Sequence, residues 1–196
     1  MRLALLGLVT ALIVVVGARV VTAADNPEPP WPGGVVRVWA PTQGTIDTMI
    51  NAATRWNGSG ADVHITVVRD RDRADVIVRR DDDTLHALCG RRCFGYTTVN
   101  GGPGELYLRE SLDELRPLSL WVAVHELGHV LGLGHRAGHG CSVMAPHWYD
   151  TSCPPSMGHQ VGSVFDPRCA PATVDVEDAV RVYGGKVRRD PYCSAT

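Results

Sequence analysis

Residues 125–135, with the sequence HELGHVLGLGH, constrain the fold of this chain more than any other segment. His125 and His129 are four residues apart, so on a helix they share one face with Cβ atoms about 5–6 Å apart. If that helix continued, His135 would lie about 15 Å further along the axis than His125. Gly132 permits the left-handed conformation that ends a helix. We therefore expect the chain to turn there and bring His135 back to the other two histidines.

Three histidines brought together in this way predict a zinc site. An imidazole nitrogen binds zinc at about 2.0–2.1 Å, and three protein ligands leave a fourth position open, as in catalytic zinc sites. Glu126 lies beside His125, His129 and His135 but outside the ligand set, so we expect it to act as a general base on water. The alternative is that the paired histidines are hydrogen-bonded core residues. The additional Gly132 and third histidine favour zinc.

The first residues resemble an export signal. Arg2 supplies a positive charge, residues 3–16 are apolar, and residues 22–24 are small. We therefore expect residues 1–24 to be a signal peptide and the protein to be secreted. The apolar run is shorter than the roughly 20 residues that a membrane-spanning helix needs, so no span is expected after cleavage. An uncleaved segment would instead anchor the protein in a membrane.

Six cysteines follow the predicted cleavage point, which in an exported chain predicts three disulfides of undetermined pairing. Cys89 and Cys93 are close enough to close a small local loop. A metal site of thiolates is the alternative, but this pair has no matching second pair at close spacing. The candidates for disulfides are Cys89, Cys93, Cys141, Cys153, Cys169 and Cys193.

The composition indicates one folded domain. Hydrophobic residues make up 44% and charged residues 20% of the 196 residues, and the net charge is −2. No long block of like charges suggests nucleic-acid binding, and we expect a monomer. Residues 25–34 are predicted to be a proline-rich linker and residues 35–196 the folded domain. The acidic residues 81–83 are predicted to form a solvated loop.

Hydrophobic periodicity predicts five strands and three helices. The predicted strands are residues 35–39, 64–68, 74–78, 96–99 and 105–108. The predicted helices are residues 45–56, a buried helix over 117–131 that Pro117 begins, and 173–183. Thr173 is predicted to cap the last helix. This order predicts an α/β sandwich, with few regular elements between residues 132 and 172.

The histidine motif resembles that of the metzincins, zinc endopeptidases that also have a tight turn with a methionine below the metal. Residues 141–146 contain a candidate for that turn. The resemblance implies that Met144 packs under the three histidines without binding zinc. Astacin-like and serralysin-like enzymes have a tyrosine two residues after this methionine, where this chain has Pro146.

The closest resemblance is to the matrixins, the matrix metalloproteinase group. It rests on the Met-Ala-Pro sequence at the turn, on residues 120–124 before the first histidine, and on residues 182–184, which end the last helix. In matrixins an aspartate early in the last helix supports the methionine turn, and Asp175 has that position. The implied fold is α/β (α+β): a twisted five-stranded mixed sheet with two helices above the cleft, and an irregular lower subdomain with a C-terminal helix.

The resemblance implies a zinc-dependent endopeptidase that hydrolyses peptide bonds, with Glu126 as general base. The substrate, a protein or peptide, is expected to pair with an edge strand, for which residues 105–108 are the candidate. Residues Pro146, Trp148 and Tyr149 are expected to line the pocket just past the cleaved bond. Calcium binding is implied by the resemblance alone.

Two alternatives remain at this point. A secreted zinc protein without catalytic activity could bind a partner through the same cleft, and a zinc hydrolase could act on a non-peptide amide. The first alternative is disfavoured because a protein that had lost catalysis would be expected to have lost Glu126 or a histidine. A panel of peptide and non-peptide amide substrates would distinguish the second alternative from an endopeptidase.

Overall fold

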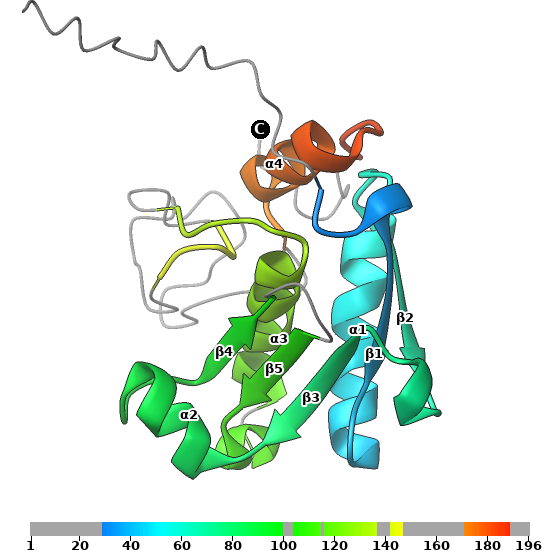
Figure 1. The fold of residues 1–196 in the computed structure, drawn as a ribbon. Helices are drawn as coiled ribbons and strands as arrows, with labels where there is room; N and C mark the ends of the chain where they lie inside the picture. Colours follow the sequence, from blue (N-terminus) through cyan, green and yellow to red (C-terminus); the bar gives the residue numbers. More distant parts are fainter. Residues whose placement is uncertain (1–28, 100–103, 115, 137–141, 147–170, 189–196) are drawn as a thin grey trace, which may run out of the picture.

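Five strands form one mixed sheet in the order β2-β1-β3-β5-β4 (Figure 1). The computed structural model describes residues 29–99, 104–114, 116–136, 142–146 and 171–188. All neighbours in the sheet are parallel except β4, which runs antiparallel to β5. The strands are β1 Val35–Trp39, β2 His64–Val68, β3 Val76–Arg80, β4 Gly95–Thr98 and β5 Gly104–Leu108. All five were predicted, the third of them two residues too early.

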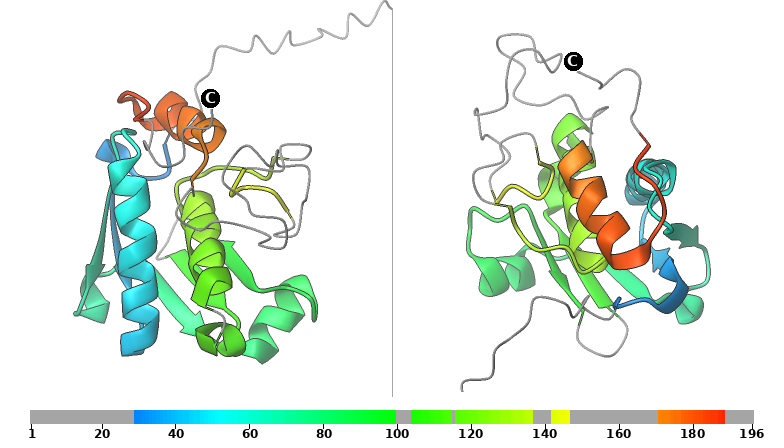
Figure 2. Two further views of the ribbon diagram at one scale, coloured as in Figure 1. Left: turned by 180° about the vertical axis from the view of Figure 1, so that it is seen from behind. Right: turned by 90° about the horizontal axis from the view of Figure 1, so that it is seen from above.

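Two long helices, α1 Gln43–Gly58 and α3 Arg116–Val130, lie side by side on one face of the sheet (Figure 2). The last helix, α4 Thr173–Tyr183, lies beyond the C-terminal end of α3. The structure also describes three 3-10 helices: Pro32–Gly34, Arg71–Arg73 and Glu110–Glu114. The predicted α/β fold with a five-stranded mixed sheet is confirmed. The predicted lower subdomain falls largely outside the described residues.

The predicted loop at residues 81–83 is wrong, because these residues begin a helix, α2 Asp82–Cys89. Asp81 is its N-cap, and the Asp81 carboxylate accepts hydrogen bonds from the backbone N and the hydroxyl of Thr84 at 3.0 and 2.6 Å. The predicted cap of α4 is also wrong. Ala172 is the N-cap there, and Thr173 is the first helical residue.

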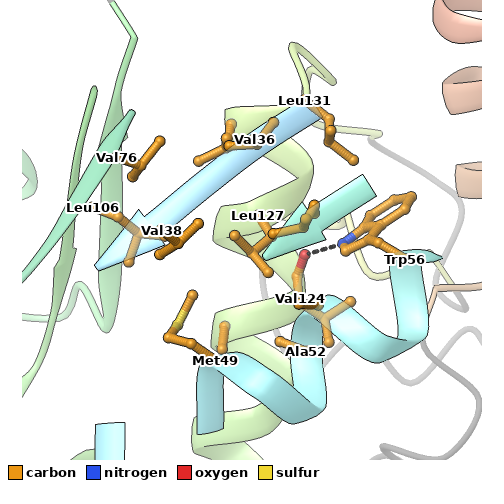
Figure 3. Close-up of a cluster of buried hydrophobic side chains, with 14 of the residues drawn as sticks. Val36, Val38, Met49, Ala52, Trp56, Val76, Leu106, Val124, Leu127 and Leu131 are labelled. Atoms are coloured by element: carbon orange, nitrogen blue, oxygen red, sulfur yellow. Dashed lines mark hydrogen bonds between the residues drawn. The ribbon is translucent and has the colours of Figure 1, made fainter. Parts of the chain in front are cut away.

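The core lies between the sheet and the pair α1 and α3 (Figure 3). Val36 and Val38 of β1 point into it, while Leu127 and Leu131 approach from α3 and its C-terminal end, and all four are fully buried. Burial of each such side chain stabilises the fold by about 1.5–3 kcal/mol. The Trp56 indole of α1 donates a hydrogen bond to the Val124 carbonyl at 2.9 Å. These contacts hold α3 in a defined position and rotation.

The predicted signal peptide, residues 1–24, lies outside the described residues, as do residues 25–28 of the predicted linker. Within the part of the chain that the structure describes, every helix is too short or too polar to span a bilayer.

Candidate active site

Helix α3 ends in the way the sequence predicts. Gly132 has a φ of 83°, in the left-handed region. Its backbone N donates to the His129 carbonyl, and the Leu133 N donates to the Gly128 carbonyl, both at 2.9 Å. This pair of bonds is a Schellman motif, which satisfies the carbonyls at the helix end and reverses the chain. The reversal brings His135 beside the two histidines of α3.

The three histidines converge through their Nε2 atoms. These atoms are 3.0 Å apart between His125 and His129, 3.1 Å between His129 and His135, and 3.3 Å between His135 and His125. Nitrogen ligands at about 2.0–2.1 Å from one zinc in tetrahedral geometry would be about 3.3 Å apart. The three ring nitrogens therefore have close to the separation that one zinc ion requires.

The hydrogen bonds on the far side of two rings determine which nitrogen carries the proton. His125 Nδ1 lies 2.6 Å from the Val143 carbonyl, and His129 Nδ1 lies 2.8 Å from the Leu133 carbonyl. A carbonyl only accepts, so each Nδ1 is protonated and each Nε2 presents a lone pair to the others. Burial lowers the pKa of His125 to about 3 and also lowers the pKa of His129, which keeps both rings neutral. Facing lone pairs at about 3 Å suit a cation, so this donor set fits zinc.

Glu126 is buried beside this group, with 3% of its surface exposed. The Thr97 hydroxyl of β4 donates to Glu126 Oε2 at 2.7 Å, which ties the carboxylate to the sheet. A Cβ on Gly95 would lie 2.5 Å from Glu126 Oε1, so only glycine leaves room there. Burial raises the pKa of Glu126 to about 8, and the bond from Thr97 acts in the opposite direction. Sequence analysis missed both Thr97 and Gly95, because neither belongs to a recognisable motif.

The predicted edge strand is wrong. Residues 105–108 belong to β5, which lies between β3 and β4, so the edge of the sheet beside the histidines is β4. Tyr96 and Thr97 of β4 line the same cleft as the three histidines and Glu126. Pro146 also lines it, whereas Trp148 and Tyr149 lie outside the described residues. Pro30, which sequence analysis placed in a linker, lies at the cleft as well, beside Gly132.

The methionine turn packs directly against α3. Met144 is buried, with 1% of its surface exposed, and a Cβ on Gly128 would lie 2.3 Å from Met144 Sδ. Gly128 stands between the two histidines of α3, so its missing side chain lets the sulfur reach the helix beneath them. This role of Gly128 was not predicted, although the glycine lies inside the motif.

Asp175 of α4 holds the turn from the other side. It is fully buried and accepts hydrogen bonds from the Val143 N at 2.8 Å, the Ala172 N at 2.9 Å and the Ser142 hydroxyl. The predicted support of the turn by Asp175 is therefore confirmed. Since the Val143 carbonyl accepts the bond from His125, the contacts of Asp175 extend to the first histidine.

A second contact with α4 holds the segment of the third histidine. Arg136 follows His135, and its guanidinium makes two hydrogen bonds to the Asp178 carboxylate, one of them at 2.7 Å. The Arg136 N also donates to the Met144 carbonyl at 2.9 Å. Neither Arg136 nor Asp178 was predicted to contribute to the site.

Of the predicted disulfides, one falls within the described residues. Cys89 at the end of α2 is bonded to Cys93 before β4. The predicted local loop is confirmed, and the thiolate metal site at this pair is excluded. The other four cysteines lie outside the described residues.

Comparison with known proteins places the chain in a family. Residues 39–156 match the family model of the matrixin peptidases. No curated protein matches the chain significantly. Among solved structures, one described as "Structure of myroilysin" is similar with a TM-score of 0.46 and 13% identity, covering 80% of this chain and 96% of that one. The family match spans more than half of the residues and includes all three histidines, so this chain belongs to the matrixin family of zinc metallopeptidases, hydrolases that act on protein or peptide substrates.

Proposed function

We propose that this matrixin is a secreted endopeptidase in which His125, His129 and His135 hold zinc and Glu126 is the general base. One observation carries the proposal. The Nε2 atoms of the three histidines converge within 3.3 Å of one another. Glu126, which lies outside that set, is buried on the same helix and tied to the edge strand.

The chemistry follows from this division of roles. Zinc bound by the three histidines would supply a Lewis acid that polarises the scissile carbonyl and makes water more acidic. Thr97 holds Glu126 Oε2, which leaves Oε1 to take a proton from the attacking water. Glu126 then passes this proton to the leaving amine. Burial raises the pKa of the Glu126 carboxyl and so favours the form that gives a proton to the amine, whereas bound zinc would favour the carboxylate that accepts one.

The position of β4 supports binding of an extended substrate. Within the described residues, β4 pairs with β5 on one side and with no strand on the other. An extended peptide can add to such an edge through backbone hydrogen bonds, and its scissile bond would then lie near Thr97 and Glu126. Recognition through the backbone needs no chain terminus, which favours cleavage within a chain.

The test is cleavage of a mixed peptide library by the purified protein, beside a chelated sample and the variant Glu126→Gln. We expect internal cuts that disappear in both controls. Glu126→Gln should still bind zinc in a competition assay with a chromophoric chelator, whereas His129→Ala should lose both zinc and cleavage. Full cleavage by Glu126→Gln would refute the role of Glu126. A folded, zinc-loaded protein that cuts nothing would favour a binding module.

Export is part of the proposal. The disulfide between Cys89 and Cys93 supports folding in an oxidising compartment, and residues 1–24 have the pattern of a signal peptide. N-terminal sequencing of protein recovered from culture medium should give a start near residue 25. Protein found only in membranes with its first residues intact would support an anchor instead.

A further inference from the structure

A short turn that connects α2 to β4 presents two arginines. Residues 90–93, here called the arginine turn, are closed by the Cys89–Cys93 disulfide and by a hydrogen bond from the Cys93 N to the Gly90 carbonyl at 3.1 Å. Gly90 has a φ of 89°, a conformation that favours glycine. Arg91 and Arg92 occupy the two central positions of the turn, and both are exposed.

The arginine turn is held in place by a third arginine. The backbone N of Arg109, which follows β5, donates to the Phe94 carbonyl at 2.9 Å, and its guanidinium donates to the Arg91 carbonyl. The same guanidinium lies 4.9 Å from the centre of the Phe94 ring and 3.2 Å from His86 Nε2. The backbone that carries Arg91 and Arg92 is therefore fixed before any ligand arrives, which lowers the entropic cost of binding.

The charges around the arginine turn are unbalanced. Arg91, Arg92 and Arg109 all line the cleft that contains the three histidines. Among the described residues that line it, Glu126 is the sole carboxylate, and it is buried and bonded to Thr97. No acidic side chain of the described residues forms an ion pair with Arg91 or Arg92. This end of the cleft is therefore positive, although the chain as a whole has a net charge of −2.

We propose that the arginine turn binds a carboxylate of the substrate and so selects acidic peptides. The proposal rests on the proposed function, since it concerns the same cleft. Guanidinium groups present paired donors that match a carboxylate. The turn directly precedes β4, so a peptide extended along Gly95 and Thr97 passes it. At about 3.3 Å per residue, the carboxylate belongs roughly two to four residues from the cleaved bond.

The carboxylate has two possible sources, an Asp or Glu side chain within a chain or the free C-terminus of a short peptide. Four matched peptides separate them: Glu or Gln at the chosen position, each with a free or an amidated C-terminus. The best position for the Glu is found with a series of peptides that place it at each successive position on either side of the cleaved bond.

Binding is measured by fluorescence anisotropy with the zinc-loaded full chain carrying Glu126→Gln, which does not consume the peptide. We expect the preferred carboxylate peptide to bind about 2- to 10-fold more tightly than its neutral counterpart, with a smaller ratio at high salt. Adding Arg91→Glu and Arg92→Glu should abolish or reverse this preference. Arg73→Glu is the matched control, because Arg73 is exposed on the 3-10 helix Arg71–Arg73 and is not among the residues that line the cleft.

Equal binding of all four peptides overturns the proposal, as does a preference that survives loss of both arginines. A preference that follows Glu assigns the arginine turn to acidic side chains, and one that follows the free C-terminus assigns it to terminal carboxylates. Cleavage is measured separately with the unaltered protein. If that protein binds acidic peptides through the arginine turn but cleaves none, the proposed function fails while this inference stands.

Discussion

Removing the carboxylate of Asp175 tests how the last helix supports the active site. Asp175 accepts hydrogen bonds from the backbone N–H groups of Val143 and Ala172 and from the Ser142 hydroxyl, and it is fully buried. In Asp175→Ala the hydroxyl can rotate to another partner, but the two N–H groups are fixed. An unsatisfied buried donor costs about 1–3 kcal/mol; Val143 is buried and Ala172 half-buried, so the free energy of unfolding should fall by about 1–5 kcal/mol.

Asp175→Asn keeps the test interpretable if the alanine variant fails to fold. One amide oxygen still accepts from the backbone, but a neutral acceptor replaces a charged one, so we expect a loss of about 1–3 kcal/mol. Because the Val143 carbonyl orients His125, zinc affinity should also fall, by about 10- to 100-fold as for other residues that position metal ligands.

The assays are urea unfolding of chelated and zinc-loaded protein and competition for zinc with a chromophoric chelator. Glu177→Gln is the matched control, since Glu177 is exposed on the same helix and its loss should change stability by less than about 0.5 kcal/mol. If Asp175→Asn resembled this control in both stability and zinc affinity, the described support of the turn would be refuted.

Three further changes probe other contacts. Gly128→Ala should reduce zinc affinity, because the new Cβ would lie 2.3 Å from the sulfur of Met144. For the same reason it should not raise the free energy of unfolding, although alanine favours a helix more than glycine does. Gly134→Ala, with open space around it, is the control in the same chelator assay. Trp56→Phe should lower the free energy of unfolding by about 1–3 kcal/mol in urea, since it loses a buried hydrogen bond and some volume. The side-chain hydrogen bond from Arg136 holds the pKa of Asp178 below its usual value. This pair therefore stabilises the fold fully above pH ~3.9, the pKa of an aspartate in the unfolded chain. The stabilisation is lost as the pH falls through the lowered pKa of the folded protein. Asp178→Asn should therefore cost about 1–3 kcal/mol at pH 7 and less below pH 4, and an equal loss at both pH values would contradict this.

Much of the framework could be predicted from local patterns. The spacing of His125 and His129, and the glycine after them, determine which side chains share a helix face and where the helix ends. Short runs rich in β-branched residues likewise predicted β1 and β2 at their observed bounds. Such features depend on backbone geometry within a few residues, so they can be inferred before any long-range contact is known.

Errors arose where a local pattern was weak or ambiguous. Helix α2 has eight residues and one buried residue, Leu85, so it has no periodic apolar face to recognise. Its only clear sign is the capping aspartate, Asp81. The pair β4 and β5 was predicted correctly as two strands, but hairpin neighbours look alike in sequence. Which of them is the outer strand depends on the pairing of β5 with β3, and that pairing is decided when the sheet assembles.

The partners that complete the site lie far apart along the chain. Thr97 reaches Glu126 across 29 residues, and Arg136 reaches Asp178 across 42. Sequence spacing identified the histidines because one helix and one turn place them. It could not identify these partners, because their contacts exist only after the core has brought β4 against the side of α3 and α4 beyond the C-terminal end of that helix. Local backbone preferences therefore determine the metal-binding motif, while the packing of distant elements determines how that motif is held and what surrounds it.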